Sequence, residues 1–228
     1  MRMRKKKNGA VRLAACAALL CERPAAPIEN SLSDFGRIAP LHLEIGCGKG
    51  GFACGMAAAH PDVCFYALER VSDVMVLAAE KAMARAAERP RDNLRFILAG
   101  AADLCAYFAP GSLSAIYLNF SDPWPKKGYA KRRLTHRAFL SVYMRLLREG
   151  GTLRLKTDNT ALFDFTLEEL AAVGLSPDFV TRDLHASPYA AGNVMTEYEA
   201  NFSSQGIPIC ALSVTAHGPL PAAPDEEE

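Results

Sequence analysis

Short apolar runs that alternate with helix-forming stretches constrain the fold of this chain more than any other feature of its sequence. Strands are predicted at residues 41–47, 64–69, 94–100, 113–120 and 152–158. Helices are predicted between and after them, at 50–59, 72–88, 102–108, 134–148 and 160–173, and the glycine pair at 150 and 151 is expected to end the fourth of these helices. Strands that are apolar along their whole length are typical of a parallel sheet covered by helices on both faces. With further strands expected near 178–184 and 207–214, the sequence predicts an α/β fold with a mostly parallel, Rossmann-like sheet of seven strands.

The length and the charge pattern predict one main domain with charged ends. The chain has 228 residues, 50% of them hydrophobic, which is enough for a single core. We predict a basic N-terminal segment and linker at 1–40, the main domain at 41–216 and an acidic, disordered tail at 217–228. The net charge is only +1, yet five of residues 1–7 and six of residues 126–137 are Lys or Arg. Such blocks either face a polyanionic partner or are simply solvated.

The cysteines and the apolar N-terminal stretch indicate where the protein is found. The seven cysteines are scattered and none forms a C-x-x-C pair, which favours a reducing cytoplasm over a disulfide framework or a metal site. Residues 10–21 follow a basic start as in a signal peptide, but the run is short and Arg12 interrupts it. We therefore predict an amphipathic helix there. No run approaches the roughly 20 apolar residues of a membrane span, so no membrane partner is expected.

A glycine-rich loop follows the first predicted strand, where parallel sheets bind their ligands. The stretch EIGCGKGGF contains Gly46, Gly48 and Gly50, a spacing different from that of dinucleotide-binding loops. Glu44, inside the strand, would be costly to bury without a partner. Glu69 ends the second strand, where an acid typically binds the ribose hydroxyls, although it could also cap the next helix. Ribose binding without a pyrophosphate-binding loop indicates S-adenosylmethionine as the cofactor.

The fourth predicted strand ends in a rigid acidic corner. In NFSDPWPKK, two prolines flank Trp124 and fix the backbone angles around it, which aims Asp122 at the pocket. Asp158 ends the fifth strand and should lie beside Asp122, with Lys126 nearby in sequence. These residues suit a polar heterocycle. The alternative is a surface corner with a helix-capping aspartate.

Taken together, these stretches resemble the bacterial tRNA (guanine-N7-)-methyltransferases, which have the class I methyltransferase fold. The resemblance covers residues 41 to about 206 and rests on EIGCGKGGF, ALER, LNFSDPWPKKGYAKRRLTH, LKTDN and GNVMTEYEANFSSQG. It implies methylation of the guanosine at position 46, in the variable loop of tRNA, by a monomer or homodimer. One departure concerns the cofactor: the family usually has Asp or Asn where this chain has Gly100, so contact with the adenine would depend on the backbone of Ala101.

The resemblance also implies roles for individual residues. S-adenosylmethionine would be held by Glu44, Gly46, Gly48, Gly50, Glu69, Ala101 and Asp122. Asp122 would in addition contact the target base as the catalytic residue. The substrate would be contacted by Lys126, Asp158, Thr196, Glu197, Tyr198 and Glu199. The RNA would be contacted by Gly128, Tyr129, Ala130, Lys131, Arg132 and Arg133. No metal is implied.

The chemistry of guanine N7 agrees with this set of residues. N7 carries a lone pair and no proton, so its methylation needs no general base, and the product ring is cationic. Carboxylates that orient and stabilise such a ring are more useful than a histidine with a tuned pKa. His136 is accordingly expected at the surface, and Cys47 as a small apolar filler. The basic block after Asp122 is expected to meet RNA phosphates.

Three other functions remain open from the sequence. A methyltransferase acting on an exocyclic amine of another RNA base has a related N-P-P-aromatic corner at this strand end. An RNA-binding scaffold with a decayed cofactor site would explain Gly100. A methyltransferase of small molecules would leave the basic block unexplained.

Overall fold

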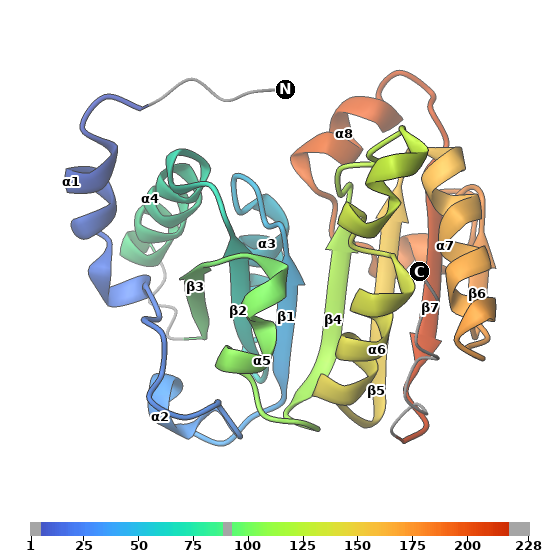
Figure 1. Cartoon of the computed structure of the whole chain (residues 1–228). Helices are drawn as coiled ribbons and strands as arrows, with labels where there is room; N and C mark the ends of the chain where they lie inside the picture. Colours follow the sequence, from blue (N-terminus) through green and yellow to red (C-terminus); the bar gives the residue numbers. More distant parts are fainter. Residues whose placement is uncertain (1–5, 89–92, 219–228) are drawn as a thin grey trace. The chain divides into compact units, whose positions relative to one another are not determined.

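A computed structural model describes residues 6–88 and 93–218 (Figure 1). The contacts divide the chain into two compact units. The first unit extends to Ala109 and includes Val194–Glu197; the second comprises Pro110–Asn193 and the chain from Tyr198 onward. The strands follow the order β3-β2-β1-β4-β5-β7-β6 in a sheet of seven. The predicted α/β fold with a mostly parallel sheet is thereby confirmed.

The first unit contains three parallel strands whose carboxyl ends are level. These are β1 (Leu41–Ile45), β2 (Cys64–Glu69) and β3 (Leu94–Leu98), each buried almost throughout. Ile45 pairs with Leu68, and Leu68 pairs with Ile97. The helical elements are α3 (Gly51–Ala59), α4 (Ser72–Glu88), η2 (Ala101–Asp103) and α5 (Leu104–Tyr107). The loops after β1 and β2 therefore lie side by side at the carboxyl ends of these strands.

The N-terminal segment packs onto this unit. The helix predicted at 10–21 is broken into α1 (Gly9–Ala14) and η1 (Ala17–Leu19), and α1 lies beside α4 through an ion pair of 2.6 Å between Arg12 and Glu80 (Figure 1). The predicted linker contains α2 (Leu32–Phe35), and Ile28 forms a β-bridge with Phe108. The predicted division into segment, domain and tail stays a prediction, and residues 219–228 of the tail lie outside the described part of the chain.

The second unit combines parallel and antiparallel strands. Here β4 (Leu113–Asn119) and β5 (Leu147–Thr157) are parallel, and β7 (Cys210–Thr215) pairs antiparallel with both β5 and β6 (Phe179–Thr181). The helical elements are η3 (Lys127–Arg132), α6 (Arg137–Leu146), α7 (Thr160–Ala172), η4 (Pro188–Gly192) and α8 (Glu197–Ser203). Within the residues that the structure describes, no helix is long and apolar enough to cross a membrane.

The junction of α6 and β5 differs from the prediction. The helix ends at Leu146, and the strand begins at once with Leu147, so the glycine pair predicted to end the helix lies inside the strand. The pairing shifts between Leu113 opposite Leu147 and Ala115 opposite Thr152, which loops out a bulge. Gly150 has a φ of 71°, and this left-handed conformation is the reason a glycine is needed in the bulge.

Candidate active site

The glycine loop after β1 leaves part of its backbone open to a ligand. Gly46, Gly48 and Gly50 have φ values of 79°, 55° and 74°, so the chain turns sharply between β1 and α3. The Gly46 N–H donates to the carbonyl of Leu68 at 2.8 Å, which ties the loop to β2. No atom lies within 4 Å of a Cβ built on Gly46 or Gly48, whereas a Cβ on Gly50 would meet Ala78 of α4 at 2.8 Å. The loop is thus packed at Gly50 and open at the other two glycines.

Glu69 at the end of β2 faces this loop. Its Oε2 accepts the Gly48 N–H at 3.2 Å, and its Oε1 accepts the Val71 N–H at 2.9 Å, one residue before α4. The carboxylate thus bonds the glycine loop and the entry to α4, as the capping interpretation requires, and its contact with a ribose stays a prediction. Each oxygen keeps a lone pair with which to accept a ribose hydroxyl. Glu44 is buried within β1, 3% exposed. The open glycines and Glu69 fit S-adenosylmethionine.

The side chain of Asp103 lies next to Gly100. Its Oδ2 accepts the Gly100 N–H at 3.2 Å and lies 3.7 Å from where a Cβ of residue 100 would be. The turn η2 thus places the exposed carboxylate of Asp103 next to Gly100, the position at which the family usually has Asp or Asn. Ala101 is half-buried beside it, and its cofactor contact stays a prediction.

In the second unit, a strained corner carries Asp122. The Phe120 N–H still bonds the Lys156 carbonyl of β5 at 2.8 Å, and the chain then leaves the sheet. Phe120 and Trp124 have φ values of 51° and 40°, left-handed conformations that are costly for residues with side chains. Asp122 lies between them and is exposed. Because strained residues of this kind cluster at functional sites, the corner is a strong candidate for the catalytic position.

The ends of β4 and β5 are neighbours, as predicted. Asn119 pairs with Lys156, so Asp122 and Asp158 both follow adjacent parallel strand ends. Asp158 is half-buried and immediately precedes Asn159, whose Oδ1 accepts the Leu162 N–H at 2.8 Å and so caps α7.

The predicted RNA-contacting segment forms the short helix η3 and the residues beside it. Most of it is exposed, namely Lys126, Lys127, Gly128, Tyr129, Lys131 and Arg132, whereas Ala130 and Arg133 are half-buried. Arg132 lies over the Tyr129 ring at 4.6 Å and over the Trp124 ring at 5.1 Å. The segment therefore presents cations and an aromatic ring to solvent.

The four residues of the TEYE stretch have different environments. Thr196 and Glu199 are buried, 6% and 0% exposed. Glu197 pairs with Lys81 of α4, and Tyr198 is exposed. Their predicted contacts with the substrate stay predictions.

A buried ionic network around Glu199 was not predicted from the sequence. Lys156 Nζ donates to Glu199 Oε2 at 2.6 Å and to Asn193 Oδ1 at 2.9 Å, while Asn193 Nδ2 donates to Glu199 Oε1. His185 Nε2 lies 3.2 Å from the same Oε1. Both oxygens of Glu199 are thus engaged by protein groups. The one signal in the sequence was a lysine inside the apolar run TLRLKTD.

His136 is buried, contrary to the expectation of a surface position. It is 7% exposed, and its Nδ1 accepts the Ala138 N–H at 3.2 Å, which caps α6. Its Nε2 lies 4.0 Å from Glu169 Oε2. Cys47 is buried as expected, and burial raises the pKa of its thiol well above the ordinary value. Neither side chain has the setting of a nucleophile.

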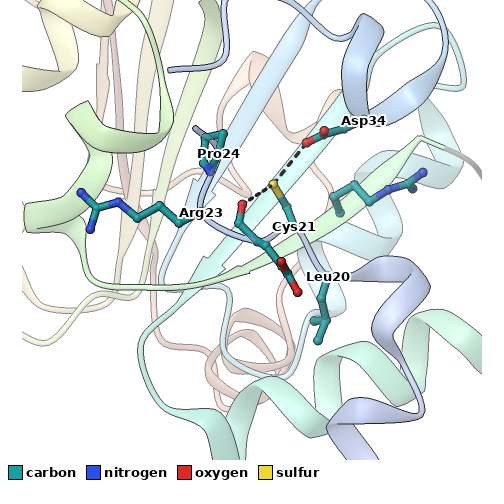
Figure 2. A pocket seen from close by; sticks show the side chains of 7 residues that line it. Leu20, Cys21, Arg23, Pro24 and Asp34 are labelled. Atoms are coloured by element: carbon teal, nitrogen blue, oxygen red, sulfur yellow. Dashed lines mark hydrogen bonds between the residues drawn. The ribbon is translucent and has the colours of Figure 1, made fainter. Parts of the chain in front are cut away.

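A separate cavity of about 370 Å³ lies beside the N-terminal segment (Figure 2). It is lined by Leu20, Cys21, Glu22, Arg23, Pro24, Asp34 and Arg95. Cys21 Sγ lies 3.2 Å from Asp34 Oδ2, and burial together with this contact raises the pKa of the thiol to about 12 (Figure 2). No residue of the glycine loop lines the cavity, and the chemistry described above does not use it.

The fold and the glycine loop with its acid define a class I methyltransferase, for which S-adenosylmethionine is the methyl donor. The family model described as "Putative methyltransferase" matches residues 38–212. The tRNA (guanine-N(7)-)-methyltransferase of Lactococcus lactis subsp. cremoris is 43% identical over 90% of this chain and 94% of that protein. The enzyme of the same name from Limosilactobacillus reuteri is 46% identical over 79% of this chain and 83% of its own length. The chain belongs to the tRNA (guanine-N(7)-)-methyltransferase family.

A solved structure supports the same fold. The 16S rRNA methyltransferase KamB has a TM-score of 0.62 with this chain at 15% identity, covering 81% of this chain and 91% of its own. At that identity the similarity concerns the fold alone.

Proposed function

We propose that this enzyme transfers the methyl group of S-adenosylmethionine to N7 of a guanosine in the variable loop of tRNA, in the cytoplasm. The observation that carries the proposal is the exposed Asp122, held in a strained corner at the end of β4 and followed at once by an exposed basic segment. The cationic side chains suit the phosphates of a polyanionic substrate, and the carboxylate beside them suits the base that reacts.

The roles proposed for residues of the first unit concern the cofactor. S-adenosylmethionine supplies an electrophilic methyl group on a sulfonium centre. In the first unit, the glycine loop would meet the cofactor through its backbone, while Glu69 would accept from the ribose. Glu44 and the backbone of Ala101 complete the proposed cofactor-binding set. All of these residues orient the cofactor and take no part in proton transfer.

In the second unit, carboxylates would act on the guanine. Asp122 and Asp158 follow neighbouring strand ends and would accept hydrogen bonds from the base. Their charge also stabilises the positive charge that develops on the ring as the N7–methyl bond forms. Since N7 has no proton to lose, orientation and electrostatics account for the catalysis that these residues provide. Lys126 and Tyr198 are proposed to contact the nucleotide.

Glu199 has a different role in this proposal. The network with Lys156 and Asn193 already engages both of its oxygens. We expect Glu199 to hold α8 against β5, so that the exposed Tyr198 is presented from a fixed backbone.

The test is methyl transfer from labelled S-adenosylmethionine to an unmodified tRNA transcript, beside a transcript whose variable-loop guanosine is changed to adenosine. The product is mapped by chain cleavage at N7-methylguanosine. We expect label and cleavage on the first transcript alone. Label on both transcripts without such cleavage would instead identify a methyltransferase that acts on another atom, such as an exocyclic amine.

The basic segment makes a second readout available. Each phosphate contact contributes about 0.7–0.9 to the slope of log affinity against log salt concentration. Exchanging Lys126, Lys127 and Lys131 for alanine should lower that slope by about 2.1–2.7 units. An unchanged slope would exclude these three lysines as phosphate contacts.

A further inference from the structure

Arg133 uses its donors inside the protein. Its Nη2 donates to the Trp124 carbonyl at 3.0 Å, and its Nε donates to the same oxygen at 3.3 Å. Its guanidinium carbon lies 4.2 Å from the centre of the Phe165 ring on α7, and the residue is half-buried. The edge with which an arginine usually grips a phosphate is thus already engaged, and one face of the group is covered by a ring.

Arg132, the next residue, has the opposite setting. It is exposed, and its guanidinium lies over the rings of Tyr129 and Trp124, at 4.6 Å and 5.1 Å. The rings hold the planar group by its face, and no side-chain contact among the described residues engages its edge in the way that the Trp124 carbonyl engages Arg133. A preoriented, exposed guanidinium is well suited to an RNA phosphate.

The carbonyl that Arg133 holds belongs to a strained residue. Trp124 has a φ of 40°, and Phe120, on the other side of Asp122, has a φ of 51°. Such conformations persist only where neighbouring groups hold them in place. Arg133 provides this restraint, because it fixes the direction of the Trp124 peptide group and ties it to α7.

We propose that Arg133 is a positioning residue that fixes the Asp122 corner, whereas Arg132 is the phosphate contact. This inference rests on the proposed function, and it separates two adjacent arginines that the sequence treats alike. It predicts that loss of Arg133 impairs turnover at saturating tRNA, and that loss of Arg132 impairs tRNA affinity.

The experiment compares Arg133→Met, Arg133→Lys, Arg132→Met and a matched control, Arg182→Met. Arg182 also pairs through Nη2, at 2.6 Å with Asp164 of α7, and lies over a ring, Phe163 at 5.5 Å, but it is distant in sequence from the corner. The measurements are kcat, KM for tRNA, the salt slope of tRNA affinity, and the fluorescence of the protein without RNA. Trp124 is the only tryptophan in the chain, so the fluorescence reports on the corner itself.

For Arg133→Met we expect a fall in kcat of tenfold or more, by analogy with the roughly hundredfold cost of misplacing a reacting group by about 1 Å. The salt slope should stay at the wild-type value, and acrylamide should quench Trp124 more strongly. Arg133→Lys, which keeps the charge but has one donor nitrogen in place of the two that Arg133 uses, should recover part of both effects. Arg132→Met should lower the slope by about 0.7–0.9 with kcat preserved. Arg182→Met should match the wild type in all four measurements.

The proposal is overturned if Arg133→Met lowers the salt slope by about 0.7–0.9 and leaves kcat and Trp124 quenching unchanged. If Arg133→Met does not fold, Arg133→Lys decides the matter by the same two readouts. The fluorescence needs no RNA. It therefore tests the placement of Arg133 even if the wild-type enzyme fails to methylate tRNA, which would refute the proposed function separately.

Discussion

Replacing Lys156 by methionine should destabilise the second unit strongly. Lys156 pairs with Glu199 at 2.6 Å, and the exposed fractions of the two side chains are 10% and 0%. The substitution leaves a carboxylate that water cannot reach and that has lost its cationic partner inside the protein, although Asn193 and the exposed His185 still contact it. Breaking a buried pair in this way typically costs about 3–5 kcal/mol of unfolding free energy.

The same reasoning gives a different value for the double variant. Exchanging both partners for apolar residues, as in Lys156→Met with Glu199→Leu, removes the buried charge together with its partner. Such exchanges are often neutral or stabilising by up to about 4 kcal/mol. The double variant should therefore unfold at a higher urea concentration than the single one. For a chain of this size, the loss of about 3–5 kcal/mol in the single variant corresponds to a lowering of Tm by roughly 6–20 °C.

Urea unfolding followed by Trp124 fluorescence measures these differences, because Trp124 and the ion pair belong to the same unit. The control is Arg182→Met, which breaks a pair with Asp164 whose side chains are 58% and 53% exposed. Because solvent screens an exposed pair, its loss should lower the unfolding free energy far less than the loss of the buried pair. A loss of similar size in Lys156→Met and the control would refute the reasoning. So would a double variant as unstable as the single one.

Three further predictions concern other parts of the molecule. Gly50→Ala should abolish binding of S-adenosylmethionine, measured by calorimetry, and should destabilise the protein more than Gly36→Ala does. Both glycines have positive φ, but only at Gly50 does a neighbouring residue occupy the space of a Cβ. Asp122→Asn should lower kcat for tRNA methylation about a hundredfold or more without changing the Tm, since the side chain is exposed. Burial acts to raise the pKa of Glu169, but hydrogen bonds and charge from Arg137 outweigh it and hold that pKa below its usual 4.5. The stabilisation is therefore present above about pH 4.5 and lost as the pH falls through the lowered pKa, so the stability difference between wild type and Glu169→Gln, followed by urea unfolding, should shrink in acid.

The strands could be predicted because their signals are local, and the same signals give the candidate site residues at the strand ends. The strand predicted at 64–69 coincides with β2, and the rule that ligands bind at strand carboxyl ends selected Glu69 and Asp122. The glycine pair after α6 was misread because glycine is equally suited to ending a helix and to a bulge in a strand. Only the pairing of β5 with β4 decides between these two possibilities.

The interior of the site could not be predicted because its contacts are distant in sequence. Lys156 and Glu199 are separated by 43 residues, and nothing near either residue indicates the other. Arg132 and Arg133 are adjacent and have the same side chain, so the sequence does not distinguish their roles. Arg133 turns inward to the carbonyl of Trp124, whose left-handed φ of 40° is unusual for a tryptophan and is not indicated by the sequence.

The strain around Asp122 is small compared with what its placement contributes. A left-handed residue costs roughly 1–2 kcal/mol, so Phe120 and Trp124 together cost about 2–4 kcal/mol. Misplacing a reacting group by about 1 Å can cost a hundredfold in rate, which equals about 2.7 kcal/mol of activation free energy. Methyl transfer to N7 removes no proton, so its rate depends on the placement of the reacting groups more than on the acid or base strength of a side chain. A rigid corner that costs part of the usual 5–15 kcal/mol of stability is therefore consistent with this chemistry. A flexible loop carrying the same aspartate would not hold it in the required place.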